Sequence, residues 1–567
     1  MGSSASAPAA ELSQEKNDIR HLGERHPFGD AELLQIYRAY QAHLRITPEA
    51  RISFLTDIGC QAVTAEAVEE RQMLLQAVEQ KILPAKFGNT LYQRAFLPSS
   101  EASGYDGVSQ QPPPSTSKIP DDEYSRMARL DAFFDGVSNC SRRGTKDVLK
   151  ILIHCCTPQP APSSSEDEPA SPFETPSHKK TLFIDPMELV TIGYRVALAA
   201  AFLQATAEND EDVARFLPKD DVDDNNNPAL QALSESLIES ATRRRQREMR
   251  SSVPPSAENK LRVVEEADVQ EWVENVATLF PSALASLMHA IFFPDKPLPR
   301  TRTNFEFPQL LSESSFFHTG SSPLLFSFAC MSSALSGEFY RLYTSSSDGL
   351  SFNRLQNALL GYGGPTLLII QSGASIFGAF TASPWKESKD FYGNTDCFLY
   401  QLLPTTAVYR PSGNARNFMY CNSFARSRGY DHQAHGIGFG GSVDQPRLFL
   451  AESFDTCHAD SQDLTFDKGP LLATTSHETH FDIDTLEVWG VGGTEVVAEA
   501  LGARMRQRGI RDAAIQKARK VDKAAFLDDF KSGIIESKAF AHRDQIRGND
   551  GAAIDMDDPN NVDYGKL

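Results

Sequence analysis

Six short apolar segments lie between residues 323 and 493, and their spacing limits the fold of this chain more than any other feature. Clusters of Gly, Pro, Asn and Ser separate the segments, as expected where a chain turns between strands. Several short strands with such punctuation are typical of a β-sandwich. The segments are 323–328, 366–370, 375–380, 397–403, 447–451 and 485–489. We predict that each is a strand of one compact β-rich domain.

The same stretch resembles the TLDc domain family. The resemblance is carried by short motifs in a fixed order, among them Phe339-Tyr-Arg-Leu-Tyr343, Gly363-Gly-Pro-Thr-Leu-Leu-Ile-Ile370, Tyr392-Gly-Asn-Thr-Asp-Cys-Phe-Leu-Tyr400 and Glu487-Val-Trp-Gly490. It implies a TLDc β-sandwich flanked by helices, which we place at residues 301–493. With the helices expected before and after this domain, the fold class is α+β.

Residues 30–300 are predicted to form a helical region. Apolar periodicity indicates helices at 30–44, 65–82, 123–134, 144–155, 186–203 and 268–292. Segments 99–121, 157–179 and 207–228 are rich in Pro, Ser or acidic residues, and we predict that they are disordered insertions. The last of these contains the acidic run 220–227, which we interpret as a solvated loop.

Several phrases in this region resemble the helical part of a lysosomal, TOR-linked member of the TLDc family, whose helices are related to EF-hand pairs. They are residues 29–37, 82–92, 131–144 and 269–273. A calcium-binding EF-hand loop needs Gly at its sixth position and Glu at its twelfth. The run 220–227 has no such Gly and is followed by Pro228, so we predict an EF-hand-like but calcium-free region.

Length and charge restrict the function classes. A chain of 567 residues is long enough for two to four domains. Its net charge of −20 opposes binding to nucleic acid as a whole. The eight cysteines show no Cys-x-x-Cys or zinc spacing, so we interpret them as reduced cytosolic thiols. The apolar stretch 189–203 contains Gly193 and Arg195, and we expect a buried helix rather than a membrane span.

The N-terminus begins Met-Gly-Ser-Ser-Ala-Ser, which fits the myristoylation pattern and makes Gly2 the candidate lipidation site within segment 1–29. One myristoyl chain gives only marginal, reversible membrane binding. Acidic residues are interspersed with Lys16, Arg20 and Arg25, so no polybasic patch supplies a second signal. We expect a protein partner on the membrane to provide it.

A basic helical region is predicted at 494–547, followed by a disordered acidic tail at 548–567. Residues 503–547 hold twelve Lys or Arg against six Asp or Glu. An apolar seam at 510, 514, 518, 521 and 525 follows one face of a helix. The helix either packs on the TLDc domain, or docks on an acidic partner or an anionic membrane. Its predicted partner-binding residues are Arg504, Arg508, Arg511, Lys517, Arg519, Lys520, Lys523, Phe526 and Phe530.

Four patterns are similar to catalytic or metal-binding motifs, but their spacing or context is wrong. Gly436-Ile-Gly-Phe-Gly-Gly441 has the letters of a dinucleotide fingerprint without a following helix. His477 and His480 are three residues apart, whereas a helical zinc motif needs four. Adjacent Cys457 and His458 would point to opposite faces of a strand. A nucleophilic site of Cys421, Asp431 and His432 would depend on the fold. We predict no enzyme, no cofactor and no metal.

The resemblance also implies a function. TLDc proteins bind the cytosolic sector of the vacuolar proton-pumping ATPase, and the TOR-linked member acts in nutrient signalling at lysosomes. We therefore expect a non-enzymatic regulator, peripheral on the cytosolic face of lysosomal or vacuolar membranes, whose partners are pump subunits and TOR-complex components. The alternatives are a thiol-dependent antioxidant enzyme and a TOR-pathway scaffold that does not contact the pump.

Overall fold

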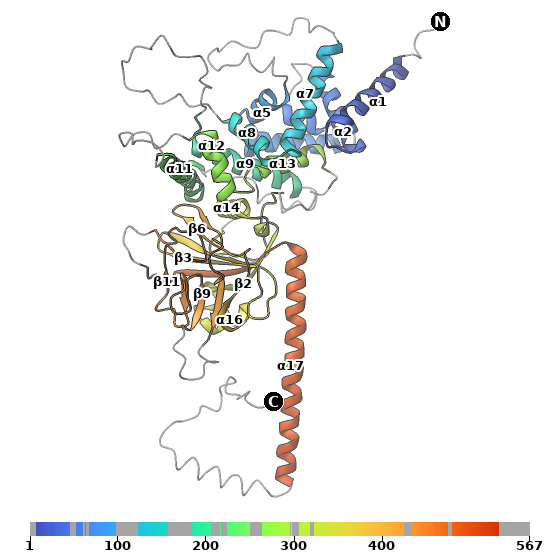
Figure 1. Ribbon diagram of the computed structural model, residues 1–567. Coiled ribbons are helices and arrows are strands. Elements are labelled where there is room, and N and C mark those ends of the chain that lie inside the picture. The colour runs from blue at the N-terminus through green and yellow to red at the C-terminus, as the bar shows by residue number, and fades with distance from the viewer. Residues whose placement is uncertain are drawn as a thin grey trace. The chain divides into compact units, whose positions relative to one another are not determined.

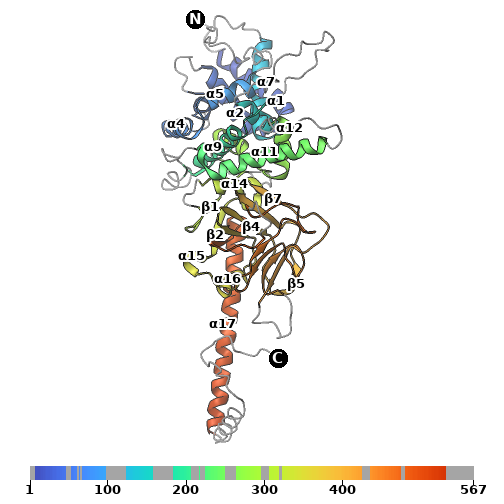
Figure 2. The ribbon, with the colours of Figure 1, turned by 90° about the vertical axis from the view of Figure 1, so that its left-hand side faces the viewer.

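The computed structural model divides into two compact units, Met1–Ala500 and Leu501–Leu567. Figures 1 and 2 show helices in the N-terminal part of the first unit and strands in its C-terminal part. The structure describes residues 7–45, 53–60, 63, 67–97, 123–156, 183–205, 216, 224–249, 264–294, 296, 305–317, 322–423, 434–473 and 479–531. The predicted insertions 99–121 and 157–179 and the tail 548–567 lie outside these residues.

The helical region contains every helix that the periodicity predicts, with one correction. Residues 268–292 form two helices, not one, because a capping box of Glu265 and Asp268 begins the first and Pro281 precedes the second. The α-helices are α1 (Ala7–Arg25), α2 (Asp30–Arg45), α3 (Phe54–Gly59), α4 (Val68–Ala77), α5 (Phe87–Leu91), α7 (Glu123–Ser141), α8 (Thr145–Cys155), α9 (Pro186–Ala205), α11 (Pro228–Met249), α12 (Glu266–Asn275) and α13 (Ser282–Phe292). Two π-helical turns, η3 (Val78–Ile82) and η4 (Tyr92–Phe96), continue α4 and α5.

Helix α9 is the centre of the helical region. Among the described residues it is the one helix long and apolar enough to cross a membrane, but it is buried along most of its length by its neighbours. Gly193 allows a close approach of α9 to Phe280, since a Cβ at this position would lie 2.2 Å from the Phe280 ring. The prediction of a buried core helix is therefore confirmed.

Part of segment 207–228 differs from the prediction of a disordered, solvated insertion. Phe216 is buried and its ring lies 5.9 Å from that of Phe307. Asp224 begins a 3₁₀ turn, η6 (Asp224–Asn226), and forms an ion pair with Arg195 of α9. Both groups of this ion pair are largely buried, so the acidic run is attached to the helical core at this point.

Two sheets pack together in the second half of the first unit. The larger has the order β1-β2-β12-β3-β4-β6-β7, and the smaller has the order β11-β10-β9-β8-β5. The strands are β1 (Gln309–Leu310), β2 (Glu338–Thr344), β3 (Thr366–Ser372), β4 (Ser375–Thr381), β5 (Ser388–Tyr392), β6 (Phe398–Leu403), β7 (Ala407–Tyr409), β8 (Met419–Asn422), β9 (Gly436–Phe439), β10 (Leu448–Ala451), β11 (His458–Ala459) and β12 (Thr485–Gly490). Strands occupy five of the six predicted segments, and the predicted sandwich is confirmed.

The larger sheet is buried on both faces. Leu368 and Ile370 of β3 pack against the smaller sheet, in one core with Ile437 and Leu450. Leu367 and Ile369 belong to the other core, which continues into the helical region. Because neighbouring residues of a strand point to opposite faces, a strand buried on both faces needs a continuous apolar run, as β3 has.

The remaining predicted strand, at 323–328, is wrong because these residues belong to helix α14 (Pro323–Met331). Pro323 is the first residue of the helix, where the missing N–H has no cost. Seven of its nine residues are buried, so α14 is apolar on all sides and has no helical periodicity to distinguish it from a buried strand. Figures 1 and 2 show α14 between the helices and the sheets.

Hydrogen bonds at the end of α14 join the two halves of the unit. The Leu279 N–H donates to the Cys330 carbonyl over 3.0 Å, and the Thr278 hydroxyl donates to Met331 over 3.1 Å. From the sheet side, Arg410 donates to the same Met331 carbonyl over 3.0 Å. These donors satisfy carbonyls that a helix end leaves free, and they fix the helical region against the sandwich.

Three short helical segments and one long helix complete the second half of the chain. They are η7 (Ser333–Leu335), α15 (Ser345–Asp348), α16 (Phe352–Leu359) and α17 (Thr494–Lys531). The first unit includes the start of α17, where Val497 and Ala500 are buried. The second unit contains the rest of the helix.

A buried arginine holds the long connection between β10 and β12. The Arg447 guanidinium is fully buried and lies 3.0 Å from the Asp463 carboxylate. It also donates to the carbonyls of Asp460, Asp467 and Gly469 over 3.2, 2.6 and 2.8 Å. A buried charge is tolerated only when it is paired and hydrogen-bonded in this way.

A buried carboxylate ties the segment that leads into the sandwich to the larger sheet. Glu487 on β12 is 0% exposed and accepts hydrogen bonds from four groups. These are the Ser314 hydroxyl at 2.7 Å, the Ser315 N–H at 2.7 Å, the Trp489 indole N–H at 3.0 Å and the Thr344 hydroxyl at 3.4 Å. Glu487 thereby fixes residues 311–317 against the edge of the larger sheet.

We expect Glu487→Gln to lower the free energy of unfolding by about 1–3 kcal/mol, because the new amide N–H₂ must face at least one of the four donors. Urea denaturation followed by circular dichroism measures this change. Glu338→Gln on β2, which alters a half-exposed carboxylate, is the matched control and should be close to neutral. Equal effects of the two variants would contradict this role of Glu487.

Candidate functional site

The glycine run 436–441 forms strand β9 and the turn that follows it, rather than a phosphate-binding loop. Strand β9 pairs antiparallel with β8 and β10, and the next element after it is the strand β10, not a helix. Gly440 and Gly441 have φ values of +68° and +69°, which favour glycine. Their N–H groups donate to the Asn417 carbonyl and the Asp463 carboxylate, so neither amide is available to a phosphate. The geometry therefore supports the interpretation that these glycines serve a tight turn and not a nucleotide.

The fold brings His480 next to His458, a pair that the sequence did not predict. His480 pairs across a β-bridge with His458, and their ring centroids are 6.2 Å apart. His458 Nε2 lies 2.8 Å from the Pro446 carbonyl. His477 lies outside the described residues. Within the described part of the chain, no three His, Cys, Asp or Glu side chains gather as a metal site would require.

The Cys457 and His458 side chains do not form a nucleophile and base pair. Cys457 is buried and its thiol lies 3.5 Å from the Phe454 carbonyl, whereas His458 stacks on Phe449. Burial raises the pKa of the Cys457 thiol to about 11. Cys421 is buried in β8, and its predicted partners Asp431 and His432 lie outside the described residues.

The thiols as a group are unsuited to peroxide chemistry. Seven of the eight cysteines are buried, and Cys155 is partly exposed. A redox-active thiol needs a low pKa and access to solvent. Burial instead raises the pKa of Cys60, Cys140, Cys155, Cys156, Cys330, Cys397 and Cys457. This observation weighs against the antioxidant-enzyme alternative.

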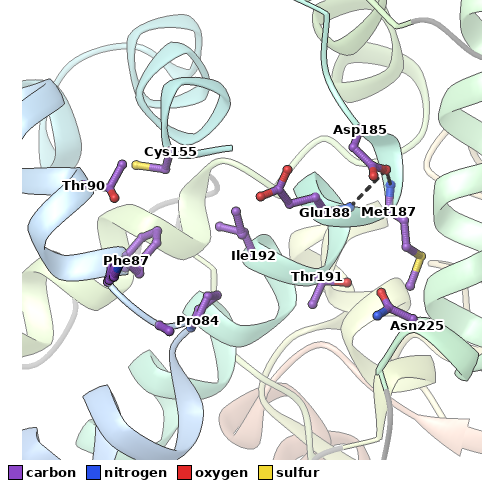
Figure 3. A pocket seen from close by; sticks show the side chains of 12 residues that line it. Pro84, Phe87, Thr90, Cys155, Asp185, Met187, Glu188, Thr191, Ile192 and Asn225 are labelled. Carbon is purple, nitrogen blue, oxygen red and sulfur yellow. Dashed lines mark hydrogen bonds between the residues drawn. The ribbon is translucent and has the colours of Figure 1, made fainter. Parts of the chain in front are cut away.

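A cavity of about 400 Å³ lies within the helical region, and sequence patterns did not predict it. Figure 3 shows Thr90 and Cys155 on one side and Asp185, Glu188 and Asn225 on the other. The Asp185 carboxylate accepts the Met187 N–H over 2.9 Å and so caps α9. Burial raises the pKa of Cys155 to about 12, which keeps this thiol protonated near neutral pH. The lining offers polar contacts but no activated nucleophile.

The described part of the N-terminal segment is attached to the helical region. Leu22 of α1 is fully buried, and Asp18 forms a bidentate ion pair with Arg126 of α7 over 2.8 and 3.2 Å. The Tyr37 hydroxyl of α2 donates to the same Asp18 carboxylate over 3.1 Å. Gly2 lies outside the described residues, so its predicted lipidation stays a prediction.

His26 follows α1 directly and contacts α7. Its side chain is buried, lies 3.9 Å from the Asp135 carboxylate and has its ring centroid 5.6 Å from that of Phe134. Burial lowers the pKa of His26, although the nearby carboxylates of Asp135 and Asp131 oppose this shift. The neutral imidazole is therefore the form that this contact favours.

All nine predicted partner-binding residues lie on α17, where the basic positions are spread around most of the helix circumference. Successive residues of an α-helix are turned by about 100°, which places the seam positions 510, 514, 518 and 521 along one strip. Lys517 and Arg511 border this strip on its two sides, Arg504 and Lys520 lie farther round the helix, and Arg508, Arg519 and Lys523 lie toward the opposite face. Phe526 and Phe530 lie on the same helix, and their side chains, like that of Arg511, are outside the description.

A lone helix cannot bury its own apolar side chains. In the second unit, which the structure describes as far as Lys531, Ile510 of the seam is 72% exposed, as is Met505 on the opposite face of the helix. Residues 503–523 carry eight Lys or Arg against two Asp. An exposed apolar seam bordered by basic residues is a common arrangement in helices that bind an acidic groove.

Comparison with known proteins identifies the sandwich. Residues 311–492 match the TLDc domain family, so this part of the chain is a TLDc domain. The chain is 29% identical over 164 residues to "MTOR-associated protein MEAK7" of Gallus gallus, which is 29% of this chain and 33% of that protein. The corresponding Danio rerio protein is 32% identical over 27% of this chain and 32% of its own length. "Oxidation resistance protein 1" of Xenopus tropicalis is 28% identical over 20% of this chain and 13% of its own length. The matches to the MEAK7 proteins thus span only about a third of those relatives.

We expect His26→Phe to remove one source of acid sensitivity. Because burial holds the folded-state pKa of His26 below the ordinary value of 6.5, the stability of the buried neutral form is present above that pH and is lost as the pH falls. The free energy of unfolding of the wild type relative to the variant should therefore decline between roughly pH 7.5 and 5.5. Urea titrations at both pH values test this, and an unchanged difference would show that His26 does not titrate on unfolding.

Proposed function

We propose that this chain is a non-enzymatic TLDc regulator that binds the cytosolic sector of the vacuolar proton-pumping ATPase and modulates its activity. In this proposal it acts peripherally on the cytosolic face of lysosomal or vacuolar membranes and also associates with TOR-complex components. The observation that carries the proposal is the TLDc domain followed directly by the basic helix α17. The TLDc family resemblance, which implies binding to this pump sector, supports it.

The charge of α17 favours an acidic protein surface as the partner. The seam consists mainly of Ala and Val, which are small and permit close approach of another backbone. Helices that lie in a membrane surface instead carry bulky Trp, Phe or Leu along the apolar face. Basic side chains on both sides of a narrow seam can then reach carboxylates of an acidic groove.

The proposed membrane attachment has two parts. A myristoyl chain on Gly2 supplies marginal, reversible affinity, and the protein partner supplies the second contact. The docked α1 keeps the described start of the chain on the helical region. Lipid and protein contacts would therefore act on the same chain.

Two names among the relatives bear on wider roles. The MEAK7 proteins are named as MTOR-associated, which supports the proposed TOR partner and leaves a TOR scaffold without pump contact as the alternative. One relative is named for oxidation resistance, and we extend this role to the chain only through protein binding. The raised pKa values of the buried thiols favour binding over thiol chemistry.

We expect a chain that ends at Gly502 to lose most of its binding to pump subunits. This end point keeps Val497 and Ala500, which are buried in the first unit, so the TLDc domain stays intact. Affinity purification with mass spectrometry, comparing this chain with the full one, measures the loss. Recovery of TOR components without pump subunits by the full chain would support the scaffold alternative instead.

A charge test separates the basic residues from the rest of the helix. Replacing Lys517, Lys520 and Lys523 together with Glu should weaken binding to the purified pump sector by at least about tenfold, or about 1.4 kcal/mol. The matched control replaces the same three residues with Arg, keeps the charge and should bind within about twofold of the wild type. Equal affinities of the Glu and Arg variants would exclude an electrostatic role.

We expect Gly2→Ala to shift the protein from the membrane fraction to the soluble fraction, because Ala at this position cannot be myristoylated. Ser4→Ala is the matched control and should leave the distribution unchanged. Fractionation of cells expressing each variant, with labelling by a myristate analogue, measures both the distribution and the modification. Labelling that persists in the Gly2→Ala variant would contradict the assignment.

A further inference from the structure

The connection between β10 and β11 holds an aromatic residue in an unfavourable backbone conformation. Phe454 has φ of +62°, in the left-handed region that residues other than Gly, Asn and Asp seldom occupy. The turn is fixed by the Phe454 N–H, which donates to the Ala451 carbonyl over 2.9 Å, and by the Cys457 thiol at 3.5 Å from the Phe454 carbonyl. Gly or Asn would form the same turn at a lower cost.

The Phe454 ring is only half-buried despite this cost. It packs on Phe352 at the start of α16, with the ring centroids 6.2 Å apart. Leu350, two residues before Phe352, is 45% exposed. Phe454 and Leu350 thus bring apolar surface to the TLDc domain on either side of the buried Phe352, and backbone strain of this kind is found preferentially at functional sites.

Carboxylates lie near Phe454, since Asp455 and Asp482 both act on the Cys457 thiol of the same turn. Glu452 and Asp455 belong to the same connection, and Asp482 is brought beside it because the Phe481 N–H donates to the Cys457 carbonyl over 3.1 Å. Arg354 of α16 contributes one positive charge. The carboxylates outnumber this cation, so the surface is complementary to a partner with basic residues around an apolar side chain.

We propose that Phe454, with Leu350 and the carboxylates of Asp455 and Asp482, forms a docking surface for a basic, apolar-bearing segment of a protein partner. The proposal rests on the proposed function, because the partner is taken to be the cytosolic sector of the proton pump. An aromatic anchor next to complementary charges is a frequent centre of binding energy in protein interfaces. This surface has the opposite charge to α17, so the two would contact different parts of the partner.

The test uses Phe454→Asn in the full chain, because Asn tolerates the left-handed conformation and removes the aromatic ring. We expect its affinity for the purified pump sector to fall at least about tenfold, while its melting temperature stays within about 3 °C of the wild type. Asp455→Lys, which alters an exposed side chain, should also weaken binding by about tenfold through charge alone. Leu464→Ala, at an apolar side chain that is 70% exposed, is the matched control and should bind like the wild type.

Each outcome separates the two proposals. If the wild type binds the pump sector and both Phe454→Asn and Asp455→Lys bind equally well, the docking surface is wrong and the proposed function stands. A fall of more than about 10 °C in the melting temperature of Phe454→Asn with unchanged affinity of Asp455→Lys would show that Phe454 serves packing alone. If the wild type does not bind the pump sector, both proposals fail.

Discussion

The burial of both faces of the seven-stranded sheet is the constraint on which the first unit depends. Leu368 and Ile370 need the smaller sheet as a cover, and Leu367 and Ile369 need α14 and the helical region. Neither cover can be removed without exposing a complete apolar face to water. The helical region is therefore part of the support of the TLDc domain, and binding is left to surfaces that this packing does not use.

The strands were predictable because burial on both faces demands uninterrupted apolar runs, and such runs are visible at residues 366–370 and 375–380. The same logic failed for α14. A helix that is covered on all sides is as apolar as a buried strand, and only Pro323 at its start distinguishes the two. The break between α12 and α13 was missed for a related reason, since Ala277 and Phe280 keep the connecting segment apolar and buried.

The residue spacing in the sequence was enough to argue against the dinucleotide and zinc motifs, because the geometry of both motifs is strict. The features that now matter for binding could not be predicted in the same way. The positive φ of Phe454 results from the turn between β10 and β11, and nothing in the letters Glu-Ser-Phe-Asp indicates it. Glu487 is similar: its sequence motif identified the domain, but only the fold shows four donors converging on the buried carboxylate.

The order of elements along the chain connects these surfaces to a single mode of attachment. Weak contacts that belong to one chain reinforce one another, because the first to form raises the effective concentration of the next. The first unit carries both α1 and the TLDc domain, and Val497 and Ala500 fix the start of α17 on that domain. A helix of 38 residues is about 57 Å long, so its basic residues are distributed over a long surface. A marginal lipid anchor, an acidic docking surface and a basic helix can each be individually weak and still give stable, reversible attachment together.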